Sequence, residues 1–240
     1  ATNYLLDVAP DSEFVGFVSG YQTRSVGNVL TEPVTGLSEG ATYYYRVRAQ
    51  SGSGTSGNSG TIAVTVLDAT APAITVPEDI VAEATGPAGA AVEFEVSAED
   101  LVDANPVLSA NPASGSVFAL GETVVTVTAM DASDNTATTN FTVMVVDTTA
   151  PVMTVPADIA VAASSPGGAT VVFSVGATDT VDPSPVVHTD IASGSLFRVG
   201  DTRVSATATD ASGNMATGSF TVTVSPSQIL AWGTNMFGDF

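Results

Sequence analysis

The chain has 240 residues, with 25 acidic residues against five arginines and no lysine, which gives a formal net charge of −20. Such a surface repels nucleic acid and anionic lipid and offers carboxylates to divalent cations, so we expect no nucleic-acid partner and no membrane insertion. The chain contains no cysteine and no apolar run of about 18 residues, so it offers no disulfide, thiolate metal site or predicted membrane-spanning helix.

The pattern of apolar residues predicts β-structure along the whole chain. Apolar residues make up 44% of the sequence, and they are chiefly valine, alanine and isoleucine interleaved with threonine and serine. This alternation has the period of two that is typical of half-buried strands, and no stretch has the period of a helix.

Residues 1–67 have the pattern of half a small sandwich. In the stretch GLSEGATYYYRVRAQ, Tyr43, Tyr45 and Val47 alternate with polar residues along one predicted strand. Leu37 and Tyr43 fit a corner in which a tyrosine hydroxyl bonds to upstream backbone. On these residues the region resembles the C-terminal half of a fibronectin type III domain.

The remaining strands of this half-domain are predicted on either side of the corner. NYLLDVAPDSEFVGFV supplies one strand, VGNVLTEPVTGL the strands that lead to the corner, and SGTIAVTV the closing strand. The first two strands of the family's sandwich do not precede Asn3. Either the chain is a segment of a longer protein, or another chain donates the missing strands as in donor-strand complementation.

Two copies of one module follow, at residues 68–147 and 148–225. The phrase DATAPAITVPEDI returns as DTTAPVMTVPADI, which aligns Thr70 with Thr149, and this alignment continues without a gap to Val145 and Val224. Val92, Phe94 and Val96 alternate with polar residues, which predicts a strand with one buried face. Phe220, Val222 and Val224 alternate with threonines in the same way and predict a closing strand.

The two copies share the motifs TAP, P-x-GA, ASGS, DAS-x-N-x-A and FTV. On these motifs the modules resemble the hyalin repeat, an immunoglobulin-like module of extracellular proteins. The resemblance implies an all-β protein of tandem immunoglobulin-like sandwiches in a rod, with the incomplete fibronectin type III-like sandwich at its N-terminus. It also implies a secreted, extracellular or cell-surface location. The family's cysteine pair is replaced here by Ala110 and Val127, and by Thr189 and Ala206.

Residues 226–240 are too apolar for a free tail on an acidic protein, so we expect them to form an interface. The apolar residues of this segment are Ile229, Leu230, Trp232, Met236 and Phe237. The stretch ILAWGTNMFGDF also resembles the opening of a propeller repeat of the chromosome-condensation-regulator type. It is therefore either the first strand of a propeller or a donor strand that fills a neighbour's half-domain, which would give head-to-tail polymers.

Aspartates and asparagines at the predicted turns and joints are candidate calcium ligands, because calcium takes hard oxygen ligands. They are Asp68, Asp131, Asp134 and Asn135 around the first module, and Asp147, Asp210 and Asn214 around the second. The alternative is that these residues form turns and face water.

Two further groups of residues raise the question of catalysis. His188, the single histidine, has Asp190 and Ser193 nearby, and two carboxylate pairs recur at Asp100 with Asp103 and at Asp179 with Asp182. Loop aspartates and chance neighbours explain these groups better than a hydrolase triad or a glycosidase pair does, so we expect no enzyme.

The sequence therefore predicts an extracellular structural protein, a stalk or filament subunit that self-associates or contacts neighbouring domains, with calcium as a candidate cofactor. The alternative is an adhesion region, binding carbohydrate or protein, within a larger secreted or cell-surface protein.

Overall fold

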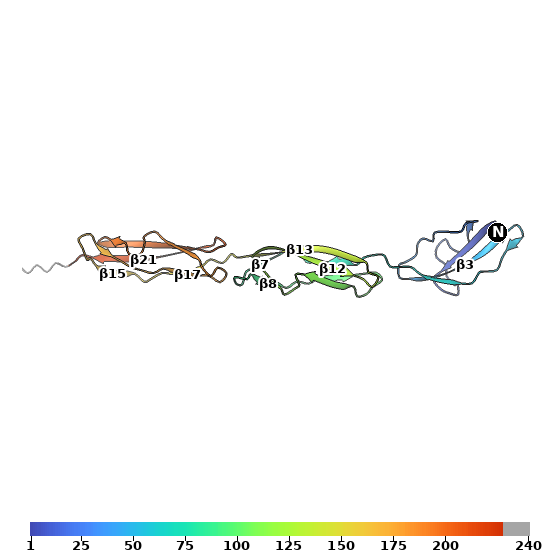
Figure 1. The fold of residues 1–240 in the computed structure, drawn as a ribbon, viewed down its shortest axis with the longest axis horizontal. Coiled ribbons are helices and arrows are strands. Elements are labelled where there is room, and N and C mark those ends of the chain that lie inside the picture. The colour runs from blue at the N-terminus through green and yellow to red at the C-terminus, as the bar shows by residue number, and fades with distance from the viewer. Residues whose placement is uncertain (228–240) are drawn as a thin grey trace, which may run out of the picture. The chain divides into compact units, whose positions relative to one another are not determined.

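The computed structural model describes residues 1–227, and within this part the chain is all-β (Figure 1). No helix in these residues is long and apolar enough to cross a membrane. The predicted interface residues Ile229, Leu230, Trp232, Met236 and Phe237 lie outside the described residues.

The chain divides into two compact units. The first consists of residues 1–77, 95–113 and 125–141, and the second of residues 78–94, 114–124 and 142 onward. The division crosses the first of the two modules predicted from the sequence, because its two longest strands run through both units.

The N-terminal part of the first unit is a single antiparallel sheet. Its strands run in the order β2-β1-β3-β4, with β5 also paired to β3. Their bounds are β1 Asn3–Ala9, β2 Arg24–Gly27, β3 Thr42–Ser51, β4 Gly54–Thr55 and β5 Ile62–Thr65.

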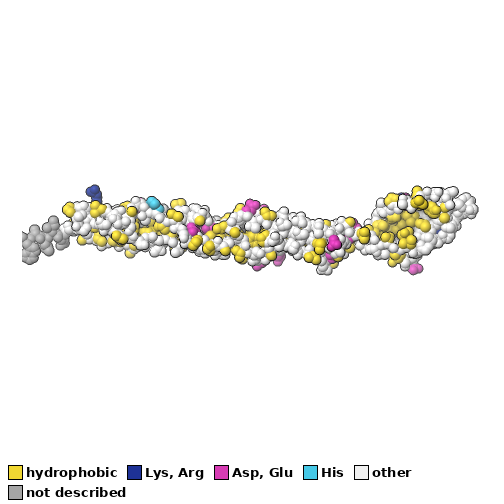
Figure 2. Space-filling model, viewed as in Figure 1, with side chains coloured by type: hydrophobic (Ala, Val, Ile, Leu, Met, Phe, Trp, Pro, Cys, Tyr) yellow, Lys and Arg dark blue, Asp and Glu magenta, His cyan; other side chains and the backbone are white. Residues whose placement is uncertain are grey.

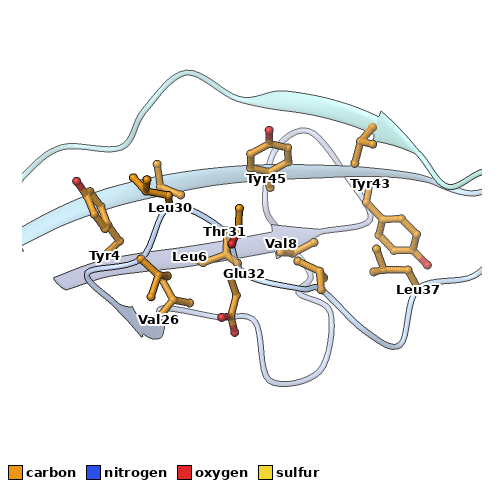
Figure 3. Close-up of a pocket in the computed structure, with 14 residues that line it drawn as sticks. Tyr4, Leu6, Val8, Val26, Leu30, Thr31, Glu32, Leu37, Tyr43 and Tyr45 are labelled. Atoms are coloured by element: carbon orange, nitrogen blue, oxygen red, sulfur yellow. The ribbon is translucent and has the colours of Figure 1, made fainter.

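The two faces of this sheet differ, because side chains alternate along each strand. Leu6, Val8 and Tyr43 form a buried cluster with Tyr21 on one face. Figures 2 and 3 show that this face remains hollowed and lined with hydrophobic side chains.

The tyrosine corner predicted from the sequence is confirmed. The Ser38 N–H donates a hydrogen bond of 3.0 Å to the hydroxyl oxygen of Tyr43. Tyr43 itself is buried near the start of β3, so its hydroxyl fixes the segment that enters this strand.

The prediction of strands throughout VGNVLTEPVTGL is wrong beyond Gly27, where β2 ends. Residues 28–37 form no strand, because no other strand of the described chain lies beside them to accept and donate backbone hydrogen bonds.

On the opposite face of the N-terminal sheet, Asp7 is the centre of a buried ion-pair network. Asp7 is 1% exposed. It accepts from Arg46 Nε at 3.0 Å, from Arg48 at 3.3 Å and from the Thr23 N–H at 2.6 Å. Burial opposes ionisation, but these donors outweigh it and hold the pKa of Asp7 below its usual value.

The two modules contain the same strands at equivalent positions of the repeat. In the first module the strands are β6 Ala73–Thr75, β7 Ile80–Glu83, β8 Ala90–Ala91, β9 Ser97–Glu99, β10 Val107–Asn111, β11 Val117–Phe118, β12 Gly121–Met130 and β13 Thr136–Val146. In the second they are β14 Val152–Thr154, β15 Ile159–Ala162, β16 Ala169–Thr170, β17 Gly176–Thr178, β18 Val186–Thr189, β19 Leu196–Phe197, β20 Gly200–Thr209 and β21 Met215–Ser225.

Strand pairing is also the same in both modules. A four-stranded sheet has the order β10-β12-β13-β7 in the first and β18-β20-β21-β15 in the second. The pairs β7 with β13 and β15 with β21 are parallel, and the short pairs β6 with β9, β8 with β11, β14 with β17 and β16 with β19 are antiparallel.

The prediction of a strand over Val92, Phe94 and Val96 is wrong, because these residues lie between β8 and β9 and form none. The closing strands do bury one face, as their alternation predicts. In β21, Phe220, Val222 and Val224 are buried and pack with Val171 and Phe197 in the core of the second module. The equivalent residues of β13, Phe141, Val143 and Val145, are buried too. Each such apolar side chain stabilises the fold by about 1.5–3 kcal/mol.

The positions that correspond to the family's cysteines are direct cross-strand neighbours. Ala110 of β10 pairs with Val127 of β12, and Thr189 of β18 pairs with Ala206 of β20. Val127 and Ala206 are buried, so packing between these strands occupies the place that the resemblance gives to a disulfide.

Gly168 permits the close approach of two segments in the second module. Its φ is +128°, and a Cβ atom there would lie 1.8 Å from the backbone oxygen of Phe197. Gly89 has the same role in the first module, where the corresponding distance to the Phe118 oxygen is 1.9 Å. Only glycine fits both the conformation and the space.

We therefore predict that Gly168→Ala lowers the free energy of unfolding by about 2 kcal/mol or more, because the backbone must shift and φ is strained. Gly176→Ala is the matched control, since no atom lies within 4 Å of its added Cβ. Calorimetry of both variants measures the effect, and equal melting curves would contradict the prediction.

A second prediction concerns Asp7. Asp7→Asn should destabilise the N-terminal sheet by about 3 kcal/mol, because two arginines lose a buried partner. Since the folded pKa of Asp7 is lowered, its contribution is present above the unfolded pKa of about 4 and disappears as the pH falls through the folded pKa. In urea unfolding, the difference in stability between the variant and the parent chain should therefore be constant from pH 7 to about pH 5 and begin to shrink below about pH 4.

Candidate metal centres

Two triads of aspartates bring carboxylate oxygens together. The first is Asp68, Asp100 and Asp131, and the second is Asp147, Asp179 and Asp210. In each triad one carboxylate oxygen per residue lies within 4.8 Å of the others. All members of the first triad belong to the first compact unit and all members of the second to the second unit.

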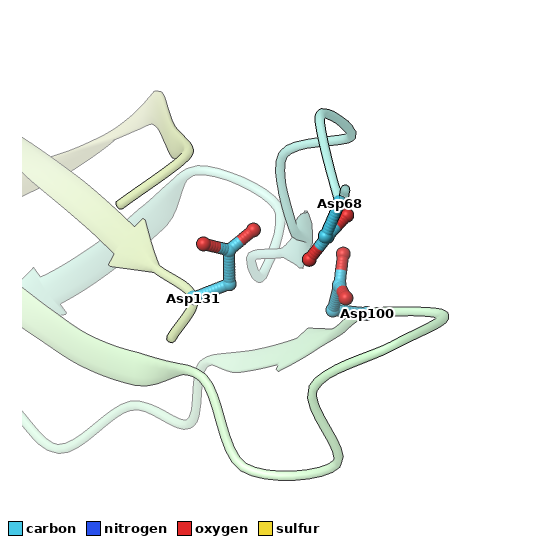
Figure 4. Close-up of side chains that lie close together, drawn as sticks. All are labelled: Asp68, Asp100 and Asp131. Atoms are coloured by element: carbon cyan, nitrogen blue, oxygen red, sulfur yellow. The ribbon is translucent and has the colours of Figure 1, made fainter. Parts of the chain in front are cut away.

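Three separate segments of the chain supply each triad. In the first, Asp68 precedes β6, Asp100 directly follows β9, and Asp131 directly follows β12. Figure 4 shows the carboxyl groups of Asp68 and Asp100 facing each other, with Asp131 beside them. The second triad is the same arrangement at the equivalent positions of the second module.

The DASDN turn fixes Asp131 in place. Asp131 Oδ1 accepts from the N–H groups of Ser133 and Asn135, each at 2.8 Å. The Asn135 amide donates to Asp131 Oδ2 at 2.8 Å and to the backbone oxygen of Asp68 at 3.3 Å. Asn135 thus ties the first residue of the module to the turn.

The second module repeats this arrangement at the DASGN turn. The Asn214 amide donates to Asp210 Oδ2 at 2.9 Å and to the backbone oxygen of Asp147 at 3.0 Å. The asparagine of each turn therefore holds two members of its triad in place.

A second loop positions Asp100. Its Oδ1 accepts from the N–H groups of Val102 at 2.8 Å and Asp103 at 2.9 Å. Asp103 in turn accepts from the Ala132 N–H at 2.9 Å, which joins this loop to the DASDN turn. In the second module Asp179 and Asp182 form the same bonds, with Ala211 in place of Ala132.

Electrostatics distinguish the members of the first triad. Burial, together with the nearby charges of Asp100, Asp131 and Glu39, raises the pKa of Asp68. The Oδ2 atom of Asp68 is buried and accepts no hydrogen bond from an N–H or O–H group of residues 1–227. For Asp131 burial acts in the same direction, but the hydrogen bonds from Asn135 and Ser133 outweigh it and lower its pKa.

In the second triad a hydroxyl group donates to the aspartate that corresponds to Asp68. Asp147 is 8% exposed, and its Oδ2 accepts from the Ser212 hydroxyl at 2.9 Å. The N–H groups of Asp182 and Val181 lower the pKa of Asp179. The two triads therefore share their geometry but differ in how well the protein itself satisfies their oxygens.

No basic side chain neutralises either triad in residues 1–227. The ion pairs there involve Arg24, Arg46 and Arg48, all in the N-terminal sheet. Two oxygens that bind the same calcium ion at 2.3–2.6 Å can lie up to about 5 Å apart. The spacing and the hard oxygen donors of each triad therefore fit a calcium ion.

The structure brings together four of the seven predicted ligands: Asp68 and Asp131 in one triad, and Asp147 and Asp210 in the other. Asn135 and Asn214 lie beside the triads, but their amides donate to the carboxylates. Asp134 is not a member, because it is exposed at the tip of its turn with a φ of +67°.

Sequence reasoning does not include Asp100 and Asp179 among the calcium ligands. The sequence pattern places both residues in turns, and the structure has these turns. Their carboxyl groups are also members of the two triads. The signal that could have found them is their recurrence at equivalent positions of the two modules, which they share with the other triad members.

The candidate hydrolase residues do not form a triad. Asp190 Oδ1 accepts from the Ser205 N–H at 2.8 Å, and the Ser193 hydroxyl donates to the Phe173 backbone oxygen at 2.7 Å. Within the described residues neither forms a hydrogen bond with His188, which is exposed on β18.

Comparison with known families gives a match over most of the chain. A family model described as the HYR domain matches residues 67–145 and 146–224. The chain is 34% identical over 182 residues to hyalin of Lytechinus variegatus, and 36% identical over 172 residues to hyalin of Strongylocentrotus purpuratus. These alignments cover 70% and 68% of this chain but only 34% and 14% of the two relatives.

Among solved structures, the chain is similar to human CDH23 EC21-23, with a TM-score of 0.40 and 12% identity over 92% of this chain and 89% of that one. It is also similar to a protocadherin gammaB7 EC3-6 cis-dimer, with a TM-score of 0.37 and 20% identity over 93% of this chain and 67% of that one.

The electrostatics of the first triad give a testable prediction. Asp68→Asn should raise the melting temperature in the presence of a chelator at pH 7, because it removes one of three crowded negative charges. The raised pKa means that ionisation of Asp68 destabilises the folded chain once the pH exceeds that pKa. The difference between variant and parent should therefore shrink as the pH falls through it.

Asp134→Asn is the matched control, because it makes the same substitution in the same module at an exposed residue outside the triad. Asparagine also tolerates the left-handed backbone conformation of Asp134. If both substitutions shift the melting temperature equally, the effect comes from total charge and not from the triad.

Proposed function

The chain belongs to the HYR domain family, and on this basis we propose that it is part of an extracellular structural protein of the adhesion type, in which calcium stabilises the start of each module. The proposed modules, 68–147 and 148–225, lie within two residues of the matched ranges 67–145 and 146–224. Residues 1–67 are proposed to be a partial fibronectin type III-like sandwich.

The recurrence of the aspartate triads is the observation that carries this proposal. Each triad joins an aspartate that precedes the first strand of a module, β6 or β14, to the loops after two other strands of that module. Without an ion, a few side-chain hydrogen bonds connect these three segments. A bound calcium ion would add a direct link between them. Asp68, Asp100 and Asp131 would supply oxygens to the first ion, and Asp147, Asp179 and Asp210 to the second.

The unpartnered oxygen of Asp68 supports the same conclusion. A buried carboxylate oxygen without a donor costs free energy unless a cation or a proton satisfies it. A cation does so without the loss of charge that protonation requires, and the −20 net charge of the chain raises the local concentration of cations.

Thermal melting of the full chain tests the proposal. Calcium at about 100 times its dissociation constant should stabilise each binding module by about 2.7 kcal/mol relative to chelator. Asp100→Asn should remove this gain in the first module and Asp179→Asn in the second, whereas Asp134→Asn should retain it. Identical melting curves with calcium and with chelator would overturn the calcium proposal.

Self-association by strand donation is a second candidate function, and it is favoured by the open apolar face of the N-terminal sheet. In this proposal the chain forms head-to-tail filaments, and the donor is the apolar segment 228–240 of a neighbour. Negative-stain images of the purified chain should show fibres with a regular repeat, and monomers at all concentrations would contradict it.

The remaining candidate is a non-enzymatic binding region, for carbohydrate or protein, within a larger secreted or cell-surface protein. It is supported by the share of the two hyalin relatives that this chain covers, which is 34% and 14%. The calcium proposal is compatible with either role, because it concerns the stability of the modules and not their ligand.

A further inference from the structure

The open face of the N-terminal sheet forms an apolar groove with a cavity of about 510 Å³ (Figure 3). Its floor consists of side chains that alternate along β1 and β3, including Leu6, Val8, Tyr45 and Val47. Its wall is the segment 29–34. The whole groove lies within the first compact unit, so it does not depend on how the units are placed.

The wall of the groove carries an exposed apolar residue. Leu30 is 102% exposed although it lines the groove, and Val29 beside it is 43% exposed. An apolar side chain held in water at the edge of an apolar cavity is typical of a surface that another chain covers.

The backbone of the same wall is not paired with any strand of the described residues. In the described part of the chain, no backbone-to-backbone hydrogen bond involves residues 29–34. The Pro33 oxygen accepts from the Tyr21 hydroxyl, at 3.4 Å. Free N–H and C=O groups beside an apolar groove are what an added β-strand uses: backbone pairing gives affinity, and alternate side chains fill the pockets.

The charge of the N-terminal sheet is compatible with the entry of a weakly charged strand. Residues 1–67 carry three of the five arginines and five of the 25 acidic residues, so the N-terminal sheet is nearly neutral on a strongly acidic chain. The modules at 68–225 carry nearly all of the remaining negative charge. Segment 228–240 also has low charge, because Asp239 is its single charged side chain.

We propose that this groove is the acceptor for segment 228–240 of a second copy of the chain, which pairs its backbone with residues 29–34 and inserts Leu230, Trp232 and Met236. This inference rests on the self-association proposed above and specifies its two surfaces. The strand-donor chain supplies the apolar side chains, and the acceptor chain supplies the groove and the unpaired backbone.

The spacing of the donor residues suits a strand. Leu230, Trp232 and Met236 are separated by even numbers of residues, so they share one face of a strand. Leu230 to Met236 and β1 are both seven residues long, so each spans about 20 Å when extended. Tyr4, Leu6 and Val8 line the groove with the same period of two.

Fluorescence offers a direct test, because Trp232 is the single tryptophan of the chain. In a concentration series of the full chain, its emission should shift to shorter wavelength as oligomers form in sedimentation velocity. Leu30→Asp should raise the dissociation constant by at least about tenfold, because it places a charge against the groove. Deletion of 228–240 should abolish assembly, and Trp232→Ala should weaken it.

Leu196→Asp is the matched control, since Leu196 is an exposed leucine outside the groove and the charge change is the same. It should leave the emission shift and the dissociation constant unchanged. Leu30 is fully exposed, so its replacement leaves the core intact, and circular dichroism of both variants checks this.

Three results would overturn the proposal. An emission shift of Trp232 that does not depend on protein concentration would mean that segment 228–240 binds within its own chain. The absence of any shift while oligomers form would mean that Trp232 stays outside the interface, and an unchanged dissociation constant in Leu30→Asp would exclude this groove.

The outcomes also separate this inference from the functions proposed above. Fibres that persist in Leu30→Asp would keep self-association and reject the groove as acceptor. The absence of oligomers in the parent chain would reject both. The calcium shift in melting temperature is read in the same samples and depends on neither.

Discussion

A β-strand has two needs. Its backbone groups must pair with a neighbouring strand, and its apolar face must be covered. In the two modules both needs are met within the chain, since β13 and β21 pair with neighbours and bury Phe141 and Phe220. Within residues 1–227 the N-terminal sheet meets neither need fully, because no backbone-to-backbone hydrogen bond involves residues 29–34 and the groove above β1 and β3 is open. The stability of the modules and the proposed assembly both follow from this difference.

The acidic character of the chain acts at two scales. Spread over the surface, the carboxylates repel nucleic acid and other acidic surfaces. Concentrated in the triads, they create positions where burial and like charge raise the pKa of Asp68, while hydrogen bonds from Asn135 lower the pKa of Asp131. A divalent cation would offset the like charges that raise the pKa of Asp68, and it would leave the hydrogen bonds from Asn135 to Asp131 in place. The triads are therefore the candidates for metal binding.

The modules obtain rigidity without cysteine. The cross-strand pair Ala110 and Val127 occupies the place of the family's disulfide, and packing of Val127 against the core replaces the covalent link. Gly89 and Gly168 allow the short strand pairs to approach closely where any larger residue would collide with backbone. Packing, glycine turns and aspartate-capped loops together hold each module, and bound calcium would add a further link.

The β-class, the two modules and the buried faces of their closing strands could be predicted before the fold was known, because alternation and an ungapped repeat are visible in the order of the residues alone. The sequence also predicted the tyrosine corner, which needs only Ser38 and Tyr43, two residues close together in the sequence. Tertiary structure alone decided that Asp100 joins Asp68 and Asp131, since loops that are far apart in the sequence meet only once the strands pair. It likewise decided that residues 28–37 form no strand, because a strand exists only where a partner lies beside it.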